Sequence, residues 1–295
     1  MEAERSQLIK AVRNNKPAAL FDALLVSFQY QGVSDAVARR YLQQHGNATW
    51  GSITRDLKSE CICPHLTDFA QVRNCRYDKI SVTCSEPELI DKCSLPRYRL
   101  RNGRLNQTVF SFYLLVRDVA SGNLITWIDQ QLADKTSVQS AQDRVVTSLR
   151  AVYGVSDKIL TMALSSLFIG MSNERPRWFD AGIAMIAIDT LVHNFLHRTG
   201  ILKECSFPHA YGALCYAPGG CADIIRRASM QIDATAFNQT FPKDFPRFVQ
   251  HAIWRYCAAD ALDVCNGTRI NDREACKNRH CQLSASCSKI SLKHQ

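Results

Sequence analysis

The sequence lacks any long hydrophobic run. No window approaches the roughly 18 uninterrupted apolar residues that a membrane-spanning helix needs. The start of the chain, MEAERSQLIKAVRNNK, alternates charged with apolar residues and does not resemble the apolar centre of a secretory signal. We therefore expect a soluble protein with no membrane partner, located inside the cell in the cytoplasm or nucleoid, or in the nucleus of a eukaryote.

Acidic residues are scarcer than basic ones. The chain has 36 Lys and Arg against 27 Asp and Glu, which gives a formal net charge of +9. A surplus of positive charge favours a polyanionic partner such as a nucleic acid, although it does not identify that partner.

Cysteine, in contrast, is abundant. The chain has 13 cysteines, an odd number, and no secretory signal precedes them. A disulfide framework is therefore a poorer explanation than metal ligation or buried free thiols.

The alternation of apolar and polar residues that is typical of half-buried strands is also missing. Apolar residues instead recur at helical spacing, and with 46% hydrophobic residues the chain can bury a substantial core. The helical stretches are residues 5–58, VFSFYLLVRDVA, LITWIDQQLA, residues 137–168, CADIIRRASM and FPRFVQHAIWRYC. The pattern predicts an all-α fold.

Two segments show no sustained period. One runs from Cys61 to about Gln107 and is an irregular insert with cysteines at positions 61, 63, 75, 84 and 93. The other is the polar tail from Cys265 onward, which is also rich in cysteine. Because such segments bury little core of their own, a bound metal is a reasonable way to hold them together.

The stretch VYGVSDKILTMAL predicts two helices joined by a tight turn. Gly154 permits the turn, and Ser156 with Asp157 can cap the second helix. Backbone amides at such a helix start suit a DNA phosphate. An ordinary helical corner with a solvated Lys158 has the same pattern.

The stretch AIDTLVHNFLHRTG places Asp189 directly after an apolar run and before a helix. This is the position of an N-cap, which is the ordinary structural role for an isolated Asp there. The pairing of this motif with the hairpin suggests more than a cap.

Together the two motifs resemble the helix-hairpin-helix DNA glycosylases that include endonuclease III. The pattern of that family is Gly-Val-Gly-x-Lys, followed downstream by Asp-Thr-x-Val and an Arg. The matching residues here are Gly154, Val155, Lys158, Asp189, Thr190, Val192 and Arg198. Ser156 replaces the second hairpin glycine, and the longer connection from Lys158 to Asp189 resembles the archaeal 8-oxoguanine glycosylase branch.

The resemblance implies further site residues. Gln29, or alternatively Gln31, matches a Gln that fills the gap left by an extruded nucleotide, although glutamines exposed at a helix end fit equally. Asp180 is a rival to Asp189 that lacks the Thr-x-Val context. Trp178 and Phe179 either line the damaged-base pocket or anchor a surface loop.

The resemblance also implies a two-lobed fold. Residues 17–58 and 205–295 would form one helical lobe from both chain ends. Residues 108–204 would form a second lobe with the hairpin and Asp189, and residues 61–107 would be the cysteine-rich insert. The resemblance also implies that the protein is a monomer.

The activity implied is base-excision repair of double-stranded DNA. A damaged, oxidised nucleotide is flipped out of the duplex, and Lys158 attacks its sugar to form a Schiff base that leads to strand cleavage. The site should desolvate Lys158, because an amine nucleophile must be unprotonated. Asp189 would stabilise the cationic sugar and assist proton transfers. Both an oxidised purine and an oxidised pyrimidine remain open as substrates.

Cysteines 257, 265, 276, 281 and 287 close the chain. Endonuclease III relatives hold a 4Fe–4S cluster at a similar position, and the five residues between Cys281 and Cys287 match the last gap of that motif. We expect Cys265, Cys276, Cys281 and Cys287 as ligands, with Cys257 as an alternative ligand and zinc or unligated thiols as alternatives to the cluster.

Other cysteines are also available to a metal. Those of the insert could form a second site or supply ligands to the first, and the trio Cys205, Cys215 and Cys221 lies within reach along the chain. The sequence does not decide which four meet.

Two other functions compete with the enzyme. One is a non-catalytic, metal-stapled DNA-binding protein that keeps the hairpin as a phosphate clamp. The other is a helical scaffold for protein partners. A steep fall of affinity with salt would separate DNA binding from the scaffold.

Overall fold

The computed structural model describes residues 2–29, 35–59, 63–98, 104–133, 138–265, 276, 278 and 281–292. Within these ranges the chain forms helices and no β-strand, and the β-bridge is a single backbone pair between Asp78 and Thr83. The all-α prediction is confirmed. In the part of the chain that the structure describes, no helix is both long and apolar enough to cross a bilayer.

The chain divides into two compact units, residues 1–181 and residues 182–295, which we describe separately. The sequence predicted one lobe that contains both chain ends, residues 17–58 and 205–295. That prediction and the two-lobed helix-hairpin-helix fold stay predictions.

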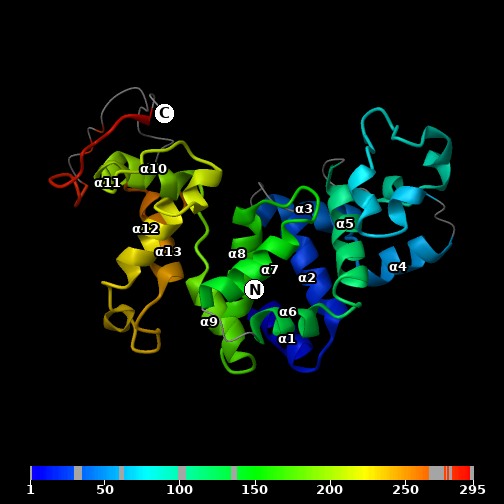
Figure 1. The fold of residues 1–295 in the computed structure, drawn as a ribbon, viewed down its shortest axis with the longest axis horizontal. Coiled ribbons are helices and arrows are strands. Elements are labelled where there is room, and N and C mark those ends of the chain that lie inside the picture. Colours follow the sequence, from blue (N-terminus) through cyan, green and yellow to red (C-terminus); the bar gives the residue numbers. More distant parts are fainter. Residues whose placement is uncertain are drawn as a thin grey trace. The chain divides into compact units, whose positions relative to one another are not determined.

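The first unit is a set of helices around α5 (Arg104–Asp118), which is buried on all sides from residue 106 to residue 116. A helix that is buried all round belongs in the centre of a core. The other helices of the unit can be followed in Figure 1. They are α1 (Glu2–Arg13), α2 (Pro17–Gln29), α3 (Asp35–His45), α4 (Trp50–Ser59), α6 (Leu124–Ala133), α7 (Val138–Leu149), α8 (Asp157–Ile169) and α9 (Pro176–Ala184), whose last turn crosses the boundary.

Aromatic rings join α2, α4 and α5. Phe21 stacks on Phe112 with ring centroids 4.7 Å apart, and Phe28 meets the same ring edge-to-face at 5.0 Å. The ring centroids of Trp50 and Tyr113 lie 4.5 Å apart. Such aromatic pairs add about 0.5–1.5 kcal/mol each beyond the area that they bury, so this cluster holds the centre of the unit.

The predicted irregular insert, residues 61–107, is described from residue 63 to residue 98, and its last residues, from Arg104, belong to α5. Residues 63–98 contain four short 3-10 helices, η1 (Pro64–Leu66), η2 (Gln71–Asn74), η3 (Pro87–Lys92) and η4 (Leu95–Arg97). Side chains of α5 hold this segment, because the Asn106 amide donates to the Leu95 carbonyl at 2.6 Å and the Gln107 amide donates to the Tyr77 carbonyl at 3.1 Å. Figure 1 shows the insert in cyan beside α4 and α5.

The predicted hairpin joins α7 to α8. Gly154 has φ +72°, the left-handed conformation that permits the turn, and a Cβ there would lie 3.0 Å from Oγ1 of Thr108. The Tyr153 amide donates to the Ser111 hydroxyl at 3.0 Å, which fixes the turn against α5.

The second unit packs α10 (Thr190–Thr199), α12 (Cys221–Ser229) and α13 (Pro246–Cys257) around one core, with the short helices α11 (Ile201–Glu204), η5 (Ala213–Tyr216) and η6 (Ala234–Ala236) between them. The core includes Val192, Leu196 and Ile225, and it also contains two cysteines, Cys215 and Cys221. This unit therefore buries thiols in its apolar centre.

Candidate metal centre

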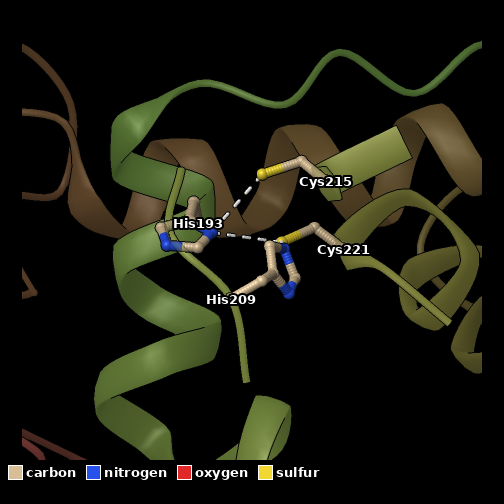
Figure 2. Close-up of side chains that lie close together, drawn as sticks. All are labelled: His193, His209, Cys215 and Cys221. Atoms are coloured by element: carbon tan, nitrogen blue, oxygen red, sulfur yellow. Dashed lines mark hydrogen bonds between the residues drawn. The ribbon is translucent and has the colours of Figure 1, made fainter. Parts of the chain in front are cut away.

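Four metal-binding side chains meet in the second unit. His193 lies on α10, His209 in the loop after α11, Cys215 in η5, and Cys221 at the first residue of α12. Their ligand atoms all lie within 4.8 Å of one another, and no other such group of His, Cys, Asp or Glu is found among the described residues. Figure 2 shows the four side chains pointing toward a common centre.

The distances match the edges of a tetrahedral site. Nδ1 of His193 lies 3.4 Å from Sγ of Cys221 and 3.5 Å from Sγ of Cys215, and Nε2 of His209 lies 3.4 Å from Sγ of Cys221. Zinc with two nitrogen and two sulfur ligands has a nitrogen–sulfur edge of about 3.6 Å, from bond lengths of about 2.0–2.1 and 2.3 Å. The group can therefore hold a metal ion.

His209 is oriented for ligation by its other ring nitrogen. Its Nδ1 lies 2.8 Å from the carbonyl oxygen of Phe207. Because a carbonyl only accepts, Nδ1 carries the proton and Nε2 presents its lone pair to the centre. A hydrogen bond of this kind is typical of metal-binding histidines.

The site is shielded from water. His193, Cys215 and Cys221 are 0% exposed. The hydrogen bond between the two thiols lowers the pKa of Cys215 and raises that of Cys221. A metal ion bound here would displace the thiol protons and bind both sulfurs.

Gly220 allows the two cysteines to approach each other. A Cβ at this position would overlap the carbonyl oxygen of Leu214 and lie 3.0 Å from those of Cys215 and Ala217. The φ of Gly220 is −75°, so space and not backbone conformation requires glycine here.

Fold and site thus define an all-α protein with a buried His2Cys2 group. In comparisons with known proteins, no family model, curated protein or solved structure matches the chain.

The two predicted catalytic residues lie in different units. Lys158 is half-buried in the first turn of α8, in the first unit. Asp189 lies in the second unit and caps α10, since its Oδ1 accepts from the Val192 amide at 2.9 Å. The structure therefore gives Asp189 the N-cap role, and the pairing with Lys158 stays a prediction.

The other hairpin residues are placed as the motif requires. Ser156 occupies the N-cap position of α8 with extended backbone, but its hydroxyl makes no capping bond. Val155 is buried and packs the turn onto the unit. Asp157 pairs with Arg150 at 2.6 Å.

Four further candidate site residues lie among the described residues. Gln29 is 0% exposed and, among the described residues, neither atom of its amide has a hydrogen-bond partner, so in this structure its side chain is not presented to a duplex. Trp178 is buried and donates to Asp129 at 2.8 Å, as an anchor does, whereas Phe179 is half-buried and Asp180 exposed. Gln31 lies outside the described residues.

The cysteines of the tail gather near the end of α13. The hydrogen bond between Cys257 and Cys265 raises the pKa of Cys257 and lowers that of Cys265. Sγ of Cys281 lies 3.1 Å from the Tyr256 hydroxyl, and the Cys287 thiol donates to the Arg198 carbonyl at 3.5 Å. Burial raises the pKa of Cys287, and neighbouring thiols, Cys276 among them, add to this.

The described part of the tail also contacts a buried cation, Arg198. Arg198 is 3% exposed, and its guanidinium helps to lower the pKa of Cys265. Ligation by Cys265, Cys276, Cys281 and Cys287 stays a prediction.

Sequence reasoning missed the two histidines. It considered Cys215 and Cys221 within a cysteine trio, but Cys205 is exposed and not part of the group. A signal was available: His209, Cys215 and Cys221 follow one another with the same gap of five residues. His193 has no such signal, because it reaches the site only through the packing of α10.

Proposed function

We propose that this protein is a base-excision DNA glycosylase with strand-nicking lyase activity, in which Lys158 is the nucleophile and Asp189 the catalytic carboxylate. The observation that carries the proposal is the α7–α8 hairpin. Its left-handed Gly154 turns the chain into the start of α8, where the Ser156 hydroxyl makes no capping bond and Lys158 follows in the first turn. Free amides at a helix start bind phosphate, so the hairpin suits a DNA backbone.

The proposed chemistry uses two residues of the chain, Lys158 and Asp189. The Lys158 amine attacks the sugar carbon as the bond to the damaged base breaks, and the base leaves with a proton. Asp189 holds one oxygen in the N-cap bond, and its Oδ2 has no hydrogen-bond partner among the described residues. That oxygen is the one that would face the developing positive charge.

The substrate proposed is double-stranded DNA that carries an oxidised base, bound by a monomer. The choice between purine and pyrimidine is left to experiment. The net charge of +9 supports a polyanionic partner.

For the metal of the His2Cys2 group we propose zinc. Four protein ligands and no open position are typical of a structural zinc site. For the C-terminal cysteines we propose a 4Fe–4S cluster, supported by the approach of Cys257, Cys265 and Cys287 to Arg198, with zinc as the alternative. Iron together with inorganic sulfide in the purified chain would support the cluster. Zinc without iron would refute the cluster and favour zinc at these cysteines.

Borohydride trapping tests the enzyme. Duplexes with 8-oxoguanine, thymine glycol or an abasic site are incubated with the unaltered chain, with Lys158→Gln and with Lys10→Gln, an exposed lysine as control. We expect a covalent adduct that Lys158→Gln loses and Lys10→Gln keeps, and the substrate that gives it names the base class. An adduct retained in Lys158→Gln would refute the nucleophile.

A second candidate function is a non-catalytic DNA-binding protein stapled by metal. The N-cap bond of Asp189 favours it, because this bond explains the residue without catalysis. Binding that weakens steeply with salt, together with no adduct and no base release on any substrate, would establish this candidate over the enzyme.

A further inference from the structure

The insert exposes apolar side chains at the tip of a small hairpin, residues 78–83. Ile80 is 95% exposed and Val82 is 56% exposed, in the turn between the paired residues Asp78 and Thr83. Val82 also has φ +51°, in the left-handed region that a β-branched residue rarely adopts. Neither side chain is buried in the chain, so packing does not offset this strain. Strained residues of this kind cluster at ligand-binding sites, and the tip is therefore a candidate contact surface.

Hydrogen bonds within the tip fix its conformation. Asp78 and Thr83 exchange two backbone hydrogen bonds of 2.8 and 3.2 Å. The Asp78 carboxylate, which is the acidic group of the turn, accepts from the amides of Ile80 and Ser81 at 2.7 and 3.0 Å. Because the turn is closed in this way, Ile80 is held outward before a partner binds, and little conformational entropy is lost on binding.

Basic side chains flank the tip. Between residues 73 and 84 the sequence has three basic residues, Arg73, Arg76 and Lys79, against one acidic residue, Asp78. Arg73 and Arg76 are exposed, and the Arg76 guanidinium is held at the base of the hairpin because it donates to the Arg73 carbonyl at 2.7 Å. An apolar tip beside cations is complementary to a DNA duplex, which has phosphates outside and stacked bases inside.

The tip and the α7–α8 hairpin, for which we proposed phosphate binding, are attached to the same face of α5. The Gln107 amide donates to the Tyr77 carbonyl at 3.1 Å, and the Ser111 hydroxyl accepts from the Tyr153 amide at 3.0 Å. Residues four apart on a helix have Cβ atoms about 5–6 Å from each other on one side. The base of the tip and the α7–α8 turn are therefore neighbours in the first unit.

This spacing suits contact with one duplex. Ile80 is three residues beyond Tyr77, and an extended chain spans about 3.3 Å per residue, so the tip reaches at most about 10 Å from its base. Phosphates along one DNA strand follow one another at about 3.4 Å along the helix axis. A duplex with a phosphate on the α7–α8 hairpin therefore has base pairs within reach of Ile80.

We propose that the tip is a second DNA-binding element, in which Ile80 inserts between base pairs of the duplex that the α7–α8 hairpin holds by its backbone. Isoleucine is among the apolar residues that unstack a base step in this way, and the bent duplex then contacts more of the protein surface. The inference rests on the DNA binding that both candidate functions share, and it does not depend on catalysis by Lys158.

Duplex binding and base stacking test the proposal together. Short undamaged duplexes carry 2-aminopurine, whose fluorescence rises when it unstacks, at successive positions. They are titrated with the full-length unaltered chain, with Ile80→Ala and with Val119→Ala, a control at an exposed aliphatic residue just after α5. We expect the unaltered chain and Val119→Ala to raise the fluorescence at one or more positions. Ile80→Ala should bind about tenfold more weakly and without that rise, because the buried apolar contact is lost.

The salt dependence of binding separates the wedge from the phosphate contacts. It should be the same for Ile80→Ala and the unaltered chain, since no charge is removed. Ile80 is almost fully exposed, so Ile80→Ala should keep the fold, and thermal unfolding verifies this.

Three outcomes would overturn the proposal. Equal affinity and equal fluorescence for Ile80→Ala and the unaltered chain would remove the wedge and leave DNA binding intact. No binding of the unaltered chain to any duplex would remove it together with both candidate functions. Binding to anionic lipid vesicles that Ile80→Ala loses, with duplex binding unchanged, would assign the tip to a lipid surface.

Discussion

Asp189 combines two demands in one side chain. Its carboxylate accepts from the Val192 amide and so satisfies one of the amides at the start of α10 that have no partner within the helix. The proposed catalysis needs the negative charge of the same group. Since asparagine caps helices as well as aspartate does but carries no charge, the two demands can be separated.

We predict that Asp189→Asn keeps the stability of the protein and abolishes base release. Asp189→Ala should abolish base release and also lower the free energy of unfolding by about 1 kcal/mol, because the cap is lost. Urea unfolding and a single-turnover assay on damaged duplex measure the two effects. Full activity in Asp189→Asn would leave the carboxylate with the capping role alone.

Gly220 and Gly51 form a matched pair for glycine replacement. We predict that Gly220→Ala destabilises the protein by about 1–3 kcal/mol and weakens zinc binding, because the methyl group overlaps backbone carbonyls of the Cys215 turn. Gly51 lies on α4 with nothing near its Cβ position, so Gly51→Ala should stabilise by about 0.5–1 kcal/mol. Thermal unfolding and zinc content measure both. Equal stability and zinc content in the two variants would contradict the close approach.

At the scale of elements, α10 connects most of the features of the second unit. Asp189 caps it, His193 points from it into the metal centre, and the carbonyls of Arg198 and Thr199 accept from Ile290 and Ser288 of the tail, at 3.0 and 3.1 Å. His197 adds a further contact, since its Nε2 donates to the Ser291 carbonyl at 3.2 Å. The helix thus supplies a side chain to the His2Cys2 group and holds the tail at its C-terminal end.

His197 gives this element a pH dependence. Burial lowers its pKa below the ordinary 6.5, and the nearby His193 and Arg198 act in the same direction, against the hydrogen bond to Ser291. The neutral form is favoured in the folded state, so the contribution to stability is present above pH 6.5 and is lost as the pH falls through the folded pKa.

We predict that His197→Gln, which keeps a donor for Ser291 but does not titrate, loses less stability than the unaltered chain between about pH 7 and pH 5. Urea unfolding across this range measures the difference, and His45→Gln, a change at an exposed position of α3, serves as control. Identical pH dependence of His197→Gln and the unaltered chain would contradict the burial argument.

At the scale of the whole molecule, the two units differ in the composition of their cores. The first has a broad aromatic and aliphatic core around α5, whereas the second places Cys215 and Cys221 in the middle of its smaller core. Removal of a metal ion would leave two buried thiols and two imidazoles without their ligand bonds. Because metal binding contributes directly to folding free energy, the second unit should depend on the ion and the centre of the first should not.

We predict that chelation speeds amide hydrogen exchange in α10 and α12 and leaves α2 and α8 unchanged. Exchange measured by mass spectrometry resolves the two units, with Cys205→Ser as a variant that keeps the response. Equal acceleration in both units, or none in α10 and α12, would show that the His2Cys2 group does not hold a metal that supports the second unit.

Much of the secondary structure followed from the sequence. Helical spacing of apolar residues predicted α6, α8, α12 and α13, because each buries one stripe against a core. The turn at Gly154 and the helix start at Asp189 were also predicted, since both depend on residues adjacent in the chain. The absence of a period between Cys61 and Gln107 predicted an irregular insert. Of this range, residues 63–98 contain only short 3-10 helices, whereas α5 begins at Arg104.

Only the tertiary structure decided which metal ligands meet. Local sequence determines local conformation, but a metal site joins residues from separate elements whose distances depend on packing. His193 lies on a helix that looks like any amphipathic helix, and it joins the His2Cys2 group because α10 shares one core with η5 and α12. For the same reason the sequence favoured the C-terminal cysteines, whereas the buried His2Cys2 group became visible only when the second unit was folded.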